Sequence, residues 1–149
     1  MEKIKDYQVQ TDRYYDPESG FWIKEEGDVI RIGYNPLVQE GTGAFVSLMM
    51  EPEGTLLNRG DAFGSVEAEK HVGQLKMPVS GEIAAVNKRV LENPRLANLD
   101  PYGDGWLIAL HPTGFEDEKK NLIHGRDSIV DWFEAELKKY QDKGWLAEP

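Results

Sequence analysis

The sequence predicts a mainly β domain of antiparallel strands that ends in a helix. Between Phe21 and Leu110 the chain consists of short, half-alternating apolar runs separated by glycine, proline, asparagine and aspartate, which is typical of strands and tight turns. Beyond Leu110 the apolar period lengthens to that of an amphipathic helix. With 149 residues, 40% of them hydrophobic and 30% charged, the chain is long enough to bury one core.

The strands follow from the apolar runs and from the turn residues between them. Glu26-Gly27-Asp28 is a hairpin-type turn, a short helical turn is expected over 35–40, and Gly41-Thr42-Gly43 breaks the next run. Seven strands are expected, at residues 21–25, 29–34, 44–49, 62–67, 75–79, 82–87 and 106–110.

The C-terminal helix is expected to begin where Asp127 or Ser128 can cap it, and Gly144 follows its end. Trp132 lies off its apolar face, and we interpret it as a lid over the edge of the core. Residues 1–18 are polar, so we expect a loosely ordered segment before a single domain over 19–149. The apolar face of the helix is formed by Ile129, Phe133, Leu137 and Tyr140.

Composition excludes several classes of function. The absence of cysteine excludes disulfides, thiolate metal sites and cysteine nucleophiles, so sulfur chemistry would need an attached group. A net charge of -10 repels nucleic acid and favours basic or mixed-charge protein partners, although it also serves solubility alone. No apolar run approaches the roughly 20 residues of a membrane span. The charged start, with Lys3 and Lys5, lacks a signal sequence, so a cytoplasmic protein without membrane contact is expected.

A lysine in the middle of the chain carries the chemical signal. The segment 67–73 lies between two strand-like runs, so Lys70 should project from a hairpin tip. Lys70 lies eight residues before Pro78 of the Pro-Val-Ser-Gly turn, whereas Lys76 lies only two before it. This pattern resembles the swinging-arm domains that carry lipoate or biotin on a hairpin lysine. Biotin carriers usually flank that lysine with methionine, so Glu69 and His71 favour lipoate; an ordinary solvated lysine is the alternative.

Two longer motifs resemble the glycine cleavage system H-protein family. The stronger is Asp100-Pro101-Tyr102-Gly103-Asp104-Gly105-Trp106-Leu107, preceded by Pro94, Leu96 and Asn98. The other, Gly60-Asp61-Ala62-Phe63-Gly64-Ser65-Val66-Glu67, is similar to the strand that leads into the family's lipoyl hairpin. The resemblance, which runs from about Phe21 to Leu137, implies an antiparallel β-sandwich or flattened barrel of the lipoyl/biotinyl-carrier hybrid-motif type, with short helices and a C-terminal helix. It also implies lipoyllysine at Lys70.

The resemblance implies a carrier subunit with no turnover of its own. A lipoate ligase or transferase would load it. Its arm would then take an aminomethyl group from a glycine decarboxylase (P protein) to an aminomethyltransferase (T protein), and a dihydrolipoyl dehydrogenase (L protein) would reoxidise the arm. The arm lets one carrier visit several active sites at high effective concentration.

Departures from the family pattern keep two alternatives open. The usual His-Glu-Trp appears here as Gly20-Phe21-Trp22, and Ala44 replaces an acidic residue, so two polar elements near the arm are missing. One alternative is an H-like lipoate-binding protein that carries sulfur or electrons for a heterodisulfide-reductase-like, sulfur-oxidising complex. The other is an unmodified interaction protein.

The remaining candidate residues carry less weight. Glu67 and Glu69 are interpreted as hairpin context that the loading enzyme reads, because alternation along a strand disfavours paired acid–base work. His71 could act on the arm's thiols as an acid–base group, although an exposed loop histidine is more often only solvated. His111 and His124 are too isolated in the sequence for a metal site. Gly64 and Gly81 are expected to serve backbone geometry near the hairpin.

Overall fold

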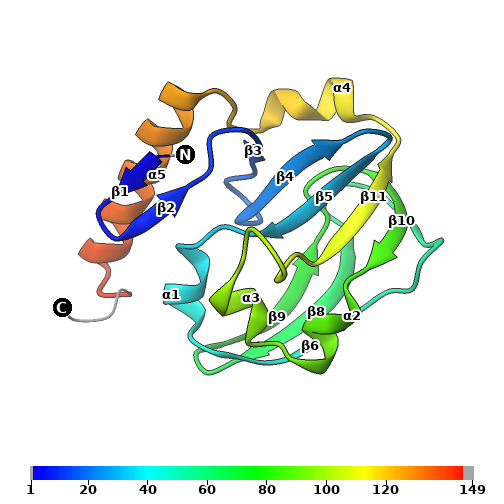
Figure 1. Cartoon of the computed structure of the whole chain (residues 1–149), viewed down its shortest axis with the longest axis horizontal. Coiled ribbons are helices and arrows are strands. Elements are labelled where there is room, and N and C mark those ends of the chain that lie inside the picture. The colour runs from blue at the N-terminus through cyan, green and yellow to red at the C-terminus, as the bar shows by residue number, and fades with distance from the viewer. Residues whose placement is uncertain (1, 146–149) are drawn as a thin grey trace.

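The computed structural model describes residues 2–145, which form two packed antiparallel sheets, a small terminal sheet and short helices, with one long helix at the C-terminal end (Figure 1). The larger sheet has the order β3 (Tyr14–Tyr15), β4 (Phe21–Glu26), β5 (Val29–Tyr34), β11 (Ile108–Pro112), β10 (Gly81–Val86) and β7 (Leu56–Leu57). The second sheet has the order β6 (Phe45–Met50), β8 (Ala62–Ala68) and β9 (His71–Lys76). The helices are α1 (Val38–Thr42), α2 (Lys88–Glu92), α3 (Leu96–Leu99), α4 (Phe115–Glu118), the 3-10 turn η1 (Lys119–Asn121) and α5 (Arg126–Asp142). The predicted fold class is confirmed.

The main core lies between these two sheets. Phe21 and Tyr34 of the larger sheet meet Phe63 and Phe45 of the smaller one, with ring centroids 5.7 Å apart for Phe21–Phe63 and 5.0 Å apart for Tyr34–Phe45. All four rings are buried. Aromatic contacts between two inner faces are the usual way in which a sandwich excludes water.

A second core joins the two ends of the described chain, which was not expected. The N-terminal hairpin β1 (Glu2–Ile4) and β2 (Tyr7–Val9) packs against α5, on the left in Figure 1. Tyr7 meets Phe133 edge-on at 5.8 Å, and Arg126 donates to Glu2 at 2.6 Å. The expectation of a loosely ordered first segment was therefore wrong, because Ile4, Val9 and Tyr15 provide apolar anchors within a polar sequence.

Element boundaries depart from the sequence prediction at several further places: the short helix expected over 35–40 is α1 at Val38–Thr42, and the short strands β3 and β7 were not expected. The strand expected at 75–79 is β9, which begins at His71. The prediction missed its first residues because the apolar Val72 faces outward, so they do not alternate between apolar inward and polar outward side chains. Helix α5 begins at Arg126 after Gly125, whose φ of +90° favours glycine, and no side chain caps it. The predicted apolar face is confirmed, since Ile129, Phe133 and Leu137 are buried.

Gly64 and Gly81 allow close backbone approach rather than a positive φ. A Cβ at Gly64 would collide with the backbone oxygen of Met49, and one at Gly81 would lie 2.7 Å from that of His111. Each glycine lies opposite a neighbouring strand, so any side chain would push that strand away.

Burial of the tyrosines predicts an alkaline loss of stability. Burial raises the pKa of all six above 10, and that of Tyr7, which also faces Glu40, to about 12. Above pH 10 the unfolded chain therefore binds fewer protons than the folded one, and the free energy of unfolding falls as pH rises. Urea denaturation at about pH 8 to 11 should show this decline. Phenolate absorbance of the folded protein should also appear mainly above pH 10; half of it appearing at lower pH would contradict the prediction.

Candidate functional site

Lys70 lies at the tip of the β8–β9 hairpin, as the sequence predicts. The turn consists of Glu69 and Lys70, between the paired residues Ala68 and His71. Lys70 is exposed and forms no ion pair within residues 2–145, although Glu67 and Glu69 are near it in sequence. Its amine is therefore accessible to a partner enzyme.

The turn is held by hydrogen bonds from outside the hairpin. The backbone N–H of Lys70 donates to the carbonyl oxygen of Thr42 at 2.9 Å, and that of Glu69 donates to Ala44 at 3.1 Å. The Glu69 carboxylate accepts from the Ala44 N–H at 2.7 Å. Two-residue hairpin turns usually need positive φ at one or both positions, yet Lys5 is the one non-glycine residue of the described chain with positive φ. The segment 42–44 thus supplies the stabilisation that the local turn lacks.

Asn98 fixes this supporting segment in turn. Its side-chain oxygen accepts from the Phe45 N–H at 2.8 Å, and its side-chain nitrogen donates to the Gly43 carbonyl at 3.1 Å. Gly43 has φ +78°, and a Cβ there would lie 3.0 Å from that of Glu69. Asn98 and Gly43 therefore position the lysine without contacting it. In the sequence Asn98 stands out only as part of a motif, and no local pattern indicates this role.

The two strands present opposite faces beside the tip. His71 is paired with Ala68, which is buried and is itself paired with the buried Phe45, so the His71 side chain, although exposed, lies on the inner side of the sheet. Val72 is paired with Glu67, and both are exposed on the outer side. The side chains of the neighbouring residues His71 and Val72 thus point to opposite faces of the sheet.

A cavity of about 280 Å³ lies on the inner side of the hairpin. His71 lines it from the hairpin, and the turn before β4 lines it with Ser19 and Gly20. Helix α5 contributes Trp132, which packs against Tyr15 and Phe133 as well. The other lining residues are Pro17, Glu18, Asn35, Leu37, Val38, Thr42, Glu136, Lys139, Tyr140 and Trp145. The cavity therefore combines aromatic walls with carboxylates and hydroxyls.

The structure explains the unusual residues Gly20 and Phe21 at the start of β4. Gly20 has φ +80°, and a Cβ there would lie 2.6 Å from a Val38 methyl group, so a histidine does not fit. Phe21 is 2% exposed and belongs to the sandwich core. The polar groups expected in this position by family resemblance are thus replaced by apolar packing.

The long motif after α3 serves the scaffold. The carbonyl of Pro101 accepts from the indole N–H of Trp22 at 2.9 Å, and the hydroxyl of Tyr102 bonds that of Tyr15 at 2.8 Å. Arg13 is 6% exposed, and its guanidinium lies over the rings of both Trp22 and Tyr102, 4.7 and 4.9 Å from their centroids. The motif therefore links the larger sheet to the terminal segment, which contains Arg13.

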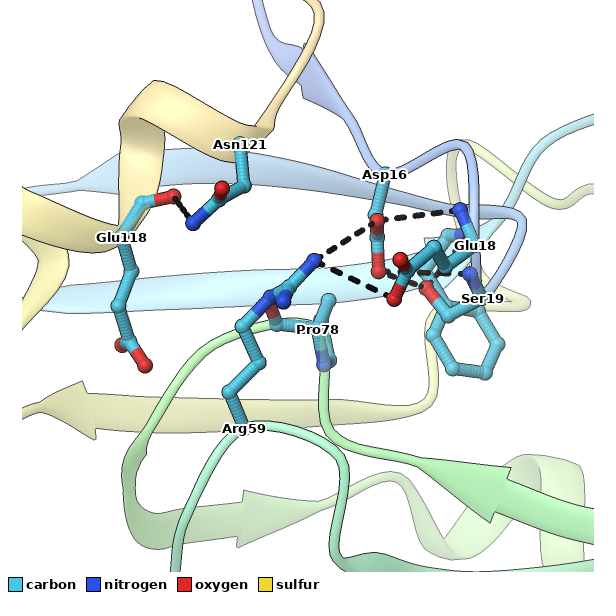
Figure 2. Close-up of polar contacts among 8 residues, drawn as sticks. Asp16, Glu18, Ser19, Arg59, Pro78, Glu118 and Asn121 are labelled. Atoms are coloured by element: carbon cyan, nitrogen blue, oxygen red, sulfur yellow. Dashed lines mark hydrogen bonds and ion pairs between the residues drawn. The ribbon is translucent and has the colours of Figure 1, made fainter.

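A polar network fixes the other end of the β8–β9 pair (Figure 2). The Arg59 guanidinium donates to the Pro78 carbonyl at 3.1 Å and lies 3.7 Å from Asp16 and 3.5 Å from Glu18. Asp16 is buried and also accepts from the Ser19 hydroxyl at 2.7 Å. Arg59 thus ties the Pro-Val-Ser-Gly turn to the turn that lines the cavity.

The other histidines lie elsewhere. His124 stacks on Tyr14 with ring centroids 4.1 Å apart, and His111 is exposed on β11. Within residues 2–145 no three histidine, aspartate or glutamate side chains are grouped to hold a metal ion. No helix of this part of the chain is long and apolar enough to cross a membrane.

A β-sandwich that presents an exposed lysine on a two-residue hairpin turn is the architecture of carrier domains that hold a cofactor on that lysine. Comparison with known proteins identifies the class more closely, because the family model for the glycine cleavage H-protein matches residues 13–133. The chain belongs to this family, whose members carry lipoate on a lysine and are carrier subunits without catalytic activity.

Individual relatives agree with this assignment. A glycine cleavage system H protein of Salinibacter ruber is 38% identical over 120 residues, covering 80% of this chain and 94% of the relative. Glycine cleavage system H protein 3 of Aquifex aeolicus is 32% identical over 139 residues, covering 91% of this chain and 83% of the relative. The crystal structure of a glycine cleavage system H protein from Mycobacterium marinum superposes with a TM-score of 0.66 at 32% identity, covering 70% of this chain and 87% of that one.

The role of Asn98 can be tested by substitution. Asn98→Leu removes both side-chain hydrogen bonds and leaves the Phe45 N–H and the Gly43 carbonyl without that partner, which should cost about 1–3 kcal/mol of unfolding free energy. Amide exchange at Lys70 should accelerate, since its acceptor lies in the loosened segment.

Asn98→Asp is the second variant, because it keeps the acceptor for the Phe45 N–H but replaces the donor to Gly43 with a carboxylate oxygen, which the Gly43 carbonyl oxygen repels. Amide exchange at Lys70 should therefore accelerate in this variant too. Unchanged Lys70 exchange in Asn98→Leu would show that the supporting segment does not hold the tip.

Proposed function

We propose that the chain is a lipoyl carrier of the glycine cleavage type, with lipoate in amide linkage to Lys70. The observation that supports this most directly is the exposed, ion-pair-free lysine on a turn that outside hydrogen bonds hold in place. In the attachment an activated lipoyl thioester or adenylate supplies the acyl group. The Lys70 nitrogen forms the new bond to the acyl carbon and gives up two protons, and the thiolate or AMP leaves.

The residues of the chain would present the arm rather than react. The bonds to Thr42 and Ala44 fix the base of the arm, so that the flexible part begins beyond Cα of Lys70. When attached, lipoate supplies the dithiolane redox and group-carrying chemistry that a chain without cysteine cannot supply itself. The cavity beside His71 offers aromatic and polar walls on the inner side of the hairpin. The lysine and its surroundings therefore fit the group.

The proposed partners follow from the family. They are a lipoate ligase or transferase, a glycine decarboxylase, an aminomethyltransferase and a dihydrolipoyl dehydrogenase. The net charge of -10 favours docking surfaces of opposite charge on these enzymes.

One observation favours a second candidate, a lipoate-binding protein that carries sulfur or electrons for a heterodisulfide-reductase-like complex. Ala44 replaces the acidic residue expected near the arm, and Phe21, in the place of the glutamate of the usual His-Glu-Trp, is buried in the sandwich core. Val38 occupies the space of the histidine expected at Gly20. An amine carried by the arm would have fewer polar partners here, whereas a sulfur cargo does not need them.

Attachment is tested by intact mass and peptide mapping after expression with lipoate. We expect the mass of one lipoyl group on Lys70 and no addition in Lys70→Arg, which keeps the charge and the exposed position. Lys76→Arg, on the same hairpin, is the control and should be modified in full. A lipoyl group on Lys76 or Lys88, or none in the wild type, would overturn the site assignment.

The two carrier functions are separated by glycine–bicarbonate exchange with the decarboxylase of the same organism. The lipoylated protein should support exchange well above the Lys70→Arg background if it serves glycine cleavage. Complete lipoylation without exchange above that background would favour the sulfur carrier.

A further inference from the structure

The outer face of the three-stranded sheet carries three large apolar side chains that are exposed to solvent. Val46 and Met49 of β6 are 58% and 66% exposed, and Val72 of β9 is 76% exposed. Met49 is paired with the outward Ser65 of β8 and Val72 with the outward Glu67, whereas Val46 is the unpaired bulge residue between Phe45 and Ser47. With strands about 4.8 Å apart, this face is roughly 10 Å wide.

This face begins beside Lys70. Val72 follows it by two residues, or roughly 7 Å along an extended strand. The other side of the hairpin is flanked by other parts of the chain, since the 42–44 segment bonds the turn and the exposed His71 lines the cavity shared with α5. A protein that reaches the base of the Lys70 side chain therefore approaches over the outer face.

We propose that this face, formed by Val46, Met49, Val72 and the outward residues of β8, is the docking surface of the enzyme that attaches the lipoyl group. The proposal rests on the proposed function. Attachment requires the lysine nitrogen itself inside the enzyme's active site, which brings the enzyme surface over the neighbours of Lys70.

The acidic residues of this face indicate which charge the partner surface should carry. Glu67 lies in the middle of the face, Glu69 adjoins Lys70, and the chain carries a net charge of -10. The complementary surface is apolar where it meets Val46, Met49 and Val72, and carries arginine or lysine opposite Glu67. Association should therefore weaken as salt increases.

The test measures lipoylation rate with a purified lipoate–protein ligase of the same organism, followed by intact mass at limiting carrier concentration. Met49→Gln combined with Val72→Thr should lower kcat/KM about tenfold, mainly through KM, because interface apolar side chains act on binding. Leu56→Gln is the matched control, since Leu56 is 67% exposed on β7 of the other sheet, and its rate should equal that of the wild type. All these side chains are exposed, so thermal unfolding should be unchanged.

Three outcomes separate the possibilities. Equal rates for the double variant and Leu56→Gln, with the wild type fully modified at Lys70, would overturn the docking surface and leave the proposed function intact. A wild type that the ligase does not modify would overturn both. A wild type that sediments as a dimer, and a double variant that sediments as a monomer with an unchanged lipoylation rate, would assign the face to a second copy of this chain instead.

Discussion

The position of Lys70 depends on the hydrogen bonds between the β8–β9 turn and the segment before β6. A two-residue turn made of glutamate and lysine without positive φ is not the geometry that best matches twisted strands. The carbonyl of Thr42 and both backbone groups of Ala44 compensate by bonding Lys70 and Glu69. Since Asn98 fixes that segment from α3, the position of the lysine depends on a residue almost 30 positions away in sequence.

The terminal segments extend the sandwich into a second layer. The β1–β2 hairpin and α5 form their own core, and Tyr7 faces Glu40 of α1, which ends at Thr42. Structure added at the two ends of the chain thus reaches the segment that supports the turn. Helix α5 also supplies the aromatic wall of the cavity through Trp132 and Tyr140. The terminal layer therefore belongs to the surroundings of the Lys70 hairpin as much as to the scaffold.

The sequence was sufficient for the sheet class, the hairpin, its lysine and the apolar face of α5, because each rests on local periodicity or turn chemistry. It was insufficient for the N-terminal strands, whose anchors Ile4, Val9 and Tyr15 are separated by polar residues and are buried only by contact with α5. It also missed the supporting role of Asn98 and the clash that excludes a side chain at Gly20. These are contacts between residues distant in sequence, which one sequence without an alignment does not reveal.

The alternation of His71 and Val72 limits how the hairpin can change during evolution. Because side chains change face at every residue, a single insertion in β9 would turn His71 outward and Val72 toward the cavity. The bulges at 62–64 in β8 and 45–47 in β6 fix the pairing against such a shift. The hairpin can therefore lengthen only by two residues at a time in each strand. The distance from Lys70 to the body of the sheet can then change only in steps of two residues along the strand.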